Sequence, residues 1–390
     1  MQLVAYGAQD IYLTGNPQIT FFKVVYRRHT NFSMEDIQQT LNGTASNNGT
    51  QTCTISRNGD LVHKVWIEYE DSGENWDYGS VYDVLKNVDC EIGGQLIDRQ
   101  HNDWNAIWWN LTTPESKVEA VRNNFVSLSG ADSSKICYVP LNFWFCRNPG
   151  LALPLIALQY HEVKLKIVWG TIANFTPKVW IKYIYLDTDE RRRFAQVSHE
   201  YLIEQVQRQT FDTNSKKNFK LNFNHPVKEL IWTSASGALG STSACQLGAP
   251  AAMTDSWKLK LNGHDRFAER VTPYFSRQQV QDYHTGPGGL ESSLTSPTLA
   301  GLVNASAVNL QGVSFANTAG TFNDSICVYS FALKPEEHQP SGTCNFSRID
   351  NAELSCTGTF ASTSRSSVIY AVNYNVLRIM SGMGGLAYSN

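Results

Sequence analysis

The stretch ISRNGDLVHKVW, residues 55–66, returns 166 positions later as LNFNHPVKELIW, residues 221–232. Both copies carry, in the same order, an aliphatic residue, an asparagine, two further aliphatic residues and a tryptophan: Ile55, Asn58, Leu61, Val65 and Trp66 in the first, and Leu221, Asn224, Val227, Ile231 and Trp232 in the second. Self-similarity at one spacing is the signature of a repeated structural unit. The two tryptophans take matched strand positions in the repeat, so truncating either to alanine is expected to leave a cavity.

Two further sequence repeats follow along the chain. The turn Gly93-Gly94 resembles Asn262-Gly263, and their second glycines lie 169 positions apart. A third set, spaced by 191 positions, matches Tyr138, Pro149 and Glu162 with Tyr329, Pro340 and Glu353. Because the order is kept while the spacing grows, we infer a duplicated domain whose second copy has gained loop residues. Two units of about 170 residues fit the chain, and each is large enough for its own core.

Apolar and polar residues alternate in many short segments, as they do in half-buried strands. The clearest segments are residues 62–69, 138–145, 163–169, 179–186, 219–223, 257–261, 326–333 and 368–379. The two turn pairs accept the positive φ that tight hairpins need, which indicates antiparallel sheets. The sequence therefore predicts an all-β protein made of two tandem jelly-roll β-sandwiches, a double jelly roll.

Helical spacing is rare and predicts short helical excursions at residues 81–88 and at residues 118–125, the second after a Thr113-Pro114 start. Residues from about 281 to 323 carry few large apolar side chains and predict a surface loop. The chain is then expected to divide into an N-terminal arm (1–25), jelly roll 1 (26–190), an inter-domain linker (191–204), jelly roll 2 (205–380) and a C-terminal tail (381–390).

Charge and hydropathy exclude several classes of function. Charged residues make up 17% of the chain and the net charge is −3, so we expect no direct nucleic-acid binding. The basic run Arg191–Arg193 follows three carboxylates and predicts a solvated or inter-domain ion network. The N-terminus does not resemble a secretory signal, and the longest apolar run, Leu151–Leu158, is too short to span a membrane.

Motifs that would indicate catalysis or cofactor binding are missing. Eight cysteines are scattered with no pair closer than nine positions, which predicts reduced core thiols instead of a zinc site or disulfides. The sequence shows no catalytic, cofactor or metal motif, although carboxylate pairs for glycoside hydrolysis stay open because their spatial separation is not visible. The group Trp104, Trp108 and Trp109 could form a sugar-stacking platform, but core filling is the favoured interpretation.

Asparagine sequons are frequent, as expected by chance in a chain rich in this residue. Eight occur, at Asn31, Asn42, Asn48, Asn110, Asn174, Asn304, Asn323 and Asn345. Only Asn304 and Asn323 fall in or beside the predicted surface loop, so these two are the candidate glycosylation sites.

Several strings resemble the major capsid proteins of nucleocytoplasmic large DNA viruses, and most closely the type found in viruses of algae. They are QLVAYGAQD (2–10), YLTGNPQITFFK (12–23), PGLALPLIALQYHEV (149–163), FALKP (331–335), PSGTCNFSRIDN (340–351) and NVLRIMSGMGGLAY (375–388). The resemblance runs from end to end and weakens only in regions that would be loops in this family. It suggests glycosylation of outer loops without identifying the sites.

The resemblance implies a structural protein and not an enzyme. A homotrimer would form a pseudo-hexagonal capsomer, and capsomers would tile an icosahedral shell, together with minor capsid and penton proteins, around an internal membrane. The protein would reside in the virion and assemble in the host cytoplasm. Residues 1–23 would form a contact segment at the capsomer base. The alternative is a carbohydrate-binding or glycoside-hydrolysing β-sandwich, which predicts a monomer with clustered carboxylates or exposed tryptophans.

Overall fold

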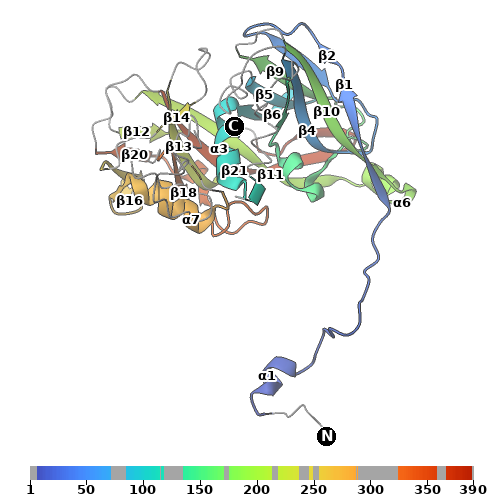
Figure 1. Ribbon diagram of the computed structural model, residues 1–390, viewed down its shortest axis with the longest axis horizontal. Coiled ribbons are helices and arrows are strands. Elements are labelled where there is room, and N and C mark those ends of the chain that lie inside the picture. Colours follow the sequence, from blue (N-terminus) through green and yellow to red (C-terminus); the bar gives the residue numbers. More distant parts are fainter. Residues whose placement is uncertain are drawn as a thin grey trace, which may run out of the picture.

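The computed structural model describes residues 7–71, 85–114, 116–117, 135–170, 175–212, 218–236, 246–248, 254–286, 288, 324–357 and 366–388. Two β-sandwiches lie side by side, and the N-terminal arm runs away from them (Figure 1). Every described strand pairing is antiparallel, as the hairpin signals predict. The predicted all-β class and two-unit organisation are confirmed.

The first sandwich consists of sheets A and B. Sheet A contains, in spatial order, β1 (Phe32–Gln39), β10 (Phe175–Leu186), β4 (Leu61–Asp71) and β7 (Lys135–Pro140), with β8 (Leu153–Pro154) beside β4. Sheet B contains β2 (Leu41–Asn42), β3 (Thr50–Thr54), β9 (Val163–Trp169), β5 (Leu85–Ile92) and β6 (Gln95–His101). Alternate residues of both sheets, such as Val65 and Ile67 of β4 and Leu165 of β9, meet in one buried core.

The second sandwich consists of sheets C and D. Sheet C contains β11 (His199–Asp212), β21 (Ser366–Met380), β13 (Pro226–Ser236) and β14 (Gln246–Gly248), with β18 (Ile326–Ser330) and β19 (Cys344–Asn345) beside β13 and β22 (Met383–Leu386) beside β21. Sheet D contains β12 (Asn218–Leu221), β20 (Ala352–Cys356), β15 (Ser256–Leu261) and β16 (His264–Asp265), with β17 (Arg270–Val271) beside β15. Trp232, Trp257 and Leu354 lie in the core between them.

The helices that the structure describes are short, as predicted. They are α1 (Asp10–Thr14), α3 (Asn102–Thr112), α5 (Trp144–Arg147), α6 (Thr188–Gln196) and α7 (Gln279–Tyr283), with single turns η1 (Pro149–Leu151) and η4 (Phe346–Arg348) and the π-helical turn η2 (Tyr274–Gln278). The helix predicted at 81–88 is wrong where the structure describes it, because Leu85 begins strand β5. A bulge between Leu85 and Asn87 places Leu85 and Val88 on one face and so imitates helical spacing. The helix predicted at 118–125 lies outside the described residues.

The two predicted hairpin turns form where the sequence places them. Gly93 and Gly94 have φ of 58° and 83°, and Asn262 and Gly263 have φ of 50° and 80°. These left-handed conformations at both central positions match the tight turn that joins two twisted strands. The β5–β6 and β15–β16 hairpins are therefore equivalent in the two sandwiches, at the 169-residue spacing.

The sequence repeat of residues 55–66 and 221–232 is offset by one residue from the positions that are equivalent in the two folded sandwiches. Val62 and Val227 both pair with a two-residue strand, β8 or β19, and both precede a bulge in the neighbouring ladder. They lie 165 positions apart, not 166. Since one residue reverses the face of a strand, Trp232 points into its core with 1% exposure while Trp66 lies on the outer face of sheet A, near Lys182. A buried cavity is thus expected for Trp232→Ala only, and the expectation for Trp66 is wrong.

The predicted boundaries cut through regular structure. Residues 191–204, predicted as a linker, hold most of α6 and the start of β11, and the predicted tail contains β22. The long strands β11 and β21 cross from one sandwich to the other, because Ile203, Leu377 and Ile379 lie in the core of the first. The predicted surface loop also begins too early, since residues 279–283 form α7. The two sandwiches are consequently joined by a shared sheet as well as by the chain connection.

Candidate functional site

The N-terminal arm, residues 7–31, exposes apolar side chains that the body does not cover. Ile19, Phe21, Phe22, Val24 and Tyr26 are 73–99% exposed. Hydrogen bonds within the arm are local, as in the bond from Gly7 to the Asp10 carboxylate and the helical bonds of α1. An exposed run of this kind marks an interaction surface. The arm is therefore the clearest candidate contact segment of the chain.

Helix α3 fills the seam between the two sandwiches. It follows β6 of the first sandwich and packs against the outer face of sheet C, where the Trp104 and Tyr370 ring centroids lie 5.2 Å apart. Trp104 and Trp108 are 0% and 7% exposed, and Trp109 packs against the first core. Core filling is confirmed, and the sugar-stacking platform is not supported. Apolar residues at helical spacing, Trp104, Ile107, Trp108 and Leu111, indicate this helix, which is not among the helices predicted from sequence.

A buried ion network crosses the same seam. The carboxylate of Glu204 on β11 lies 2.8 Å from both Arg147 of α5 and Lys228 of β13, whose side chain is fully buried. The Arg147 guanidinium also lies 3.9 Å from the Trp108 ring centroid. Removing one partner of such a network leaves an uncompensated buried charge, so the network selects one arrangement of the sandwiches.

Further polar contacts hold α3 and β6 to β11. Arg208 of β11 lies 3.2 Å from the Asp103 carboxylate and donates to the Tyr370 hydroxyl. The Asp98 carboxylate accepts from the Val206 backbone N–H, and burial raises the pKa of Asp98 to about 6. The basic run Arg191–Arg193 is exposed, as the solvated alternative predicts, and Arg191 pairs with Asp60 at 2.8 Å within the first sandwich instead of across the seam. The seam is thus a preformed interface within one chain.

One carboxylate pair shares a histidine in the second sandwich. His284 Nε2 lies 3.0 Å from Glu229 and its Nδ1 lies 3.1 Å from Glu336, while the side chains of His284 and Glu229 are fully buried. Burial lowers the pKa of His284, but the two carboxylates outweigh it and raise the pKa to about 9. The histidine is therefore protonated at neutral pH and joins α7 to sheet C as a structural ion network.

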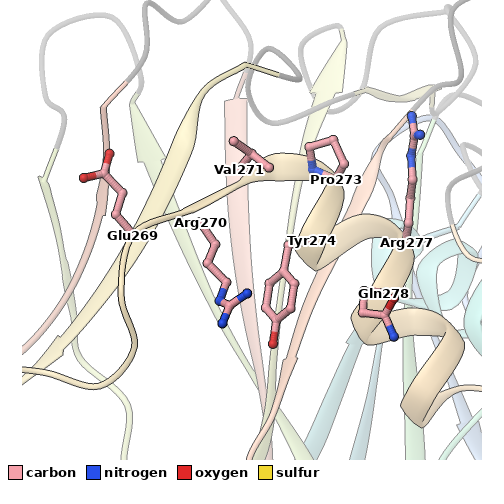
Figure 2. Close-up of a pocket in the computed structure, with 7 residues that line it drawn as sticks. All are labelled: Glu269, Arg270, Val271, Pro273, Tyr274, Arg277 and Gln278. Atoms are coloured by element: carbon pink, nitrogen blue, oxygen red, sulfur yellow. The ribbon is translucent and has the colours of Figure 1, made fainter.

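An open depression of about 560 Å³ lies beside η2 (Figure 2). Arg270 extends along the Tyr274 ring, with 4.4 Å between the guanidinium carbon and the ring centroid, and Glu269 points away from both. Arg277 pairs with the Asp324 carboxylate at 2.9 Å. The lining thus holds a single carboxylate, whereas glycoside hydrolysis needs two across the scissile bond.

The described residues hold neither a clustered metal-ligand set nor a membrane-spanning helix. Across the described ranges, no three His, Cys, Asp or Glu side chains gather closely enough to hold a metal ion. Cys53, Cys90, Cys146 and Cys327 are buried free thiols, Cys344 is a partly buried free thiol, and Cys356 is buried. Burial raises the pKa of Cys53 to about 12, which keeps it protonated and unreactive. In the part of the chain that the structure describes, no helix is long and apolar enough to cross a membrane.

The two candidate glycosylation sites, Asn304 and Asn323, lie outside the described residues. Other sequons are placed by the structure. Asn42 and Asn48 are exposed around the β2–β3 turn, and Asn110 lies partly buried in α3. Asn345 is exposed, but its side chain accepts from the Ser347 backbone N–H at the start of η4. The exposure of Asn42 and Asn48 was not predicted, because the surface loop was predicted from a long stretch with few large apolar residues and the loop that carries these two asparagines is short.

Known proteins with the same two-part organisation match this chain along its length. A family model described as the major capsid protein N-terminus matches residues 20–176, and one described as the large eukaryotic DNA virus major capsid protein matches residues 190–298 and 311–385. The major capsid protein of Pyramimonas orientalis virus is 50% identical over 412 residues, which cover 100% of this chain and 99% of the relative. That of Paramecium bursaria Chlorella virus 1 is 41% identical over 467 residues, with the same coverage of each chain.

Solved structures agree with these relatives. A chain of the PBCV-1 virus capsid aligns with a TM-score of 0.76 at 38% identity, over 95% of this chain and 100% of the other. The Faustovirus major capsid protein aligns with a TM-score of 0.67 over 96% of this chain and 95% of its own, and at 12% identity it shows the fold alone. This chain belongs to the family of major capsid proteins of large eukaryotic DNA viruses, which are structural proteins of the virion's capsid shell and not enzymes.

Proposed function

We propose that three copies of this chain form a pseudo-hexagonal capsomer and that these capsomers tile an icosahedral shell. The observation that carries the proposal is the presence of two similar sandwiches side by side in one chain (Figure 1). Three such chains present six similar units, so a threefold oligomer can occupy a sixfold lattice position without six separate chains. The duplication is then the functional device of the protein.

The surface and the seam support this assembly. Charged residues are 17% of the chain, which suits the extensive uncharged contacts of an obligate oligomer. The buried network of Arg147, Glu204 and Lys228 holds the sandwiches in one arrangement before any contact with another copy. A rigid pair of sandwiches keeps the six units of a trimer at fixed angles, as a repeating lattice requires.

The mass of the purified protein under native conditions tests the proposal. Sedimentation at micromolar concentration and after tenfold dilution should give three times the 43.7 kDa chain mass. Negatively stained particles should show hexagonal outlines of threefold symmetry. A monomer at both concentrations would contradict the proposal, because a capsomer must persist on dilution.

The proposal implies that each capsomer contacts neighbouring capsomers. Minor capsid and penton proteins would lie at the edges and vertices of the shell, and an internal membrane would lie beneath it. Assembly would take place in the host cytoplasm. Support comes from the similarity to a chain of the PBCV-1 virus capsid. Imaging of infected cells with an antibody to this chain should show cytoplasmic shells, and nuclear shells would contradict that part of the proposal.

The division of the chain and its modification belong to the same proposal. Residues up to 31, six more than the predicted 1–25 because β1 begins at Phe32, would act as the arm, and the sandwich of sheets A and B and that of sheets C and D would be the two jelly rolls. Asn304 and Asn323 stay candidate glycosylation sites, and the exposed Asn42 joins them. Intact-mass and peptide measurements on virion-derived protein test the sites, because each occupied asparagine adds the mass of a glycan. Unmodified peptides at all three positions would exclude them.

A further inference from the structure

A groove of about 620 Å³ opens near the end of the first sandwich from which the arm leaves. Its lining comes from residues 157–160, 195–198 and 379–382. The middle segment contains the end of α6, and Figure 1 shows α6 beside the root of the arm. Phe32, the first residue of β1, pairs with Leu186, which stands two positions before α6. Groove and arm root are therefore at the same end of the molecule.

Three large apolar side chains stand exposed in the groove, among lining residues that are otherwise mostly polar or small, such as Gln159 and Gln196. Tyr160, Val197 and Met380 are 75%, 54% and 48% exposed. The Tyr160 backbone N–H donates to the Gly382 carbonyl at 2.9 Å, and a Cβ at Gly382 would lie 2.6 Å from the Tyr160 ring. The tyrosine ring thus lies directly on the glycine backbone. Exposed large apolar side chains on a preformed surface indicate a contact site for another apolar segment.

The arm carries matching side chains and the opposite charge. Its exposed apolar residues between Ile19 and Tyr26 are interleaved with Lys23 and followed by Arg27 and Arg28. Residues 1–31 hold these three cations against one carboxylate, Asp10, a net charge of +2. The whole chain is at −3, so the remainder is at −5. The net charges of the arm and of the remainder of the chain are thus opposite in sign.

The arm is long enough to reach a neighbour. Residues 7–31, if extended, span up to about 80 Å. A body of this size has a radius of gyration of about 20 Å. In a layer of copies that share one orientation, an arm leaving near this end meets the next copy at the level of the same groove. Figure 1 shows the arm extending away from its own body. Its apolar side chains between Ile19 and Tyr26 are exposed.

We propose that this groove receives residues 19–26 of the arm of a second copy of this chain. The inference rests on the proposed function only in requiring that copies stand side by side in one orientation. Phe21, Phe22 and Val24 would cover Tyr160, Val197 and Met380, and the basic end of the arm would face the acidic body. The contact would link copies through a segment that leaves each sandwich fold intact.

Cross-linking in the full-length protein tests the contact. A Phe22→Cys, Val197→Cys double variant, oxidised with diamide, should form a disulfide between chains and give bands of at least twice the chain mass on denaturing gels. The matched control is Phe22→Cys with Val271→Cys, because Val271 is a similarly exposed valine, at 47%, on the second sandwich. Equal cross-linking in both would overturn the inference, and so would a product that stays at the mass of one chain.

A second measurement does not depend on introduced thiols. Val197→Arg places a cation in the groove and should weaken association of copies at least tenfold, while Val271→Arg should not. Equal association constants for the two variants would overturn the inference. A third outcome would also overturn the inference. If the wild type and both variants float with phosphatidylserine vesicles and self-associate less in their presence, the arm binds a membrane instead. The trimer mass, measured separately, identifies failure of the proposed function itself.

Discussion

Replacing Trp232 and Trp257 separately by phenylalanine tests how the hydrogen bonding of a buried indole N–H affects the stability of the second core. The two rings are 5.5 Å apart at 1% and 0% exposure, so both changes remove the same group from one cluster. Trp257 Nε1 donates to the Thr272 hydroxyl at 3.2 Å. Trp232 Nε1 is buried without an acceptor among the described residues. The pair of variants therefore differs mainly in whether a hydrogen bond is lost.

The expected difference in stability between the two variants follows from the hydrogen bonding of the two indole N–H groups. Both variants lose similar apolar volume, but Trp232→Phe also removes an unsatisfied buried N–H, a group that costs about 1–3 kcal/mol. Trp257→Phe instead deletes a hydrogen bond with a net contribution of about 1 kcal/mol. We expect Trp257→Phe to be less stable than Trp232→Phe by about 2 kcal/mol. For a unit of this size, that corresponds to about 4–8 °C in thermal midpoint.

Scanning calorimetry at one protein concentration is the assay, because association of copies shifts the midpoint. Trp232→Ala serves as the reference for a full cavity and should lose about 3–5 kcal/mol. Gel filtration confirms that each variant keeps the wild-type oligomer. Equal midpoints for the two phenylalanine variants, or a lower midpoint for Trp232→Phe, would refute the reasoning, since the indole N–H would then not decide the cost.

Three further predictions concern pH, the loop and the thiols. The pKa of His284 is raised from 6.5 to about 9, so the stability from its carboxylate partners is fully present below pH 6.5 and lost as pH rises through 9. Thermal scans across this window should show the wild type losing about 3 kcal/mol more than His284→Gln, and parallel curves would contradict this. Replacing residues 290–318 by a short Gly-Ser connection should change stability by only about 1–2 kcal/mol through closure entropy, and a loss as large as that of Trp232→Ala would place the segment in a core. Mild reductant should leave the midpoint unchanged, whereas a drop of about 10 °C would reveal a disulfide.

Local sequence determined the strands and the tight turns. Residues 163–169 alternate strictly and form β9 with the predicted bounds, because period-2 burial is a property of the strand itself. Gly93-Gly94 and Asn262-Gly263 form their turns because few residues accept positive φ at both positions. The long strings shared with capsid proteins identified the family, since they combine many positions at once. These features depend on residues that are close together in the chain.

Register and helix placement could not be read in the same way. A bulge near Leu85 turned a strand pattern into an apparent helix, and a one-residue offset put Trp66 and Trp232 on opposite faces. Helix α3 carries a helical spacing, but the fold places it between two sandwiches far apart in sequence. Bulges and packing partners depend on the pairing strand, so a single segment does not reveal them.

The sequence by itself determined that the chain holds two related antiparallel units of the capsid-protein type, because alternation, turn residues and family strings are local. Tertiary structure alone decided how the units are joined. Glu204 meets Arg147 and Lys228, and Asp103 meets Arg208, only after β11 has crossed the seam. The groove at Val197 likewise needs three distant segments. Contacts between residues so far apart are set by the folded arrangement, since no local pattern encodes which distant charges and surfaces will meet.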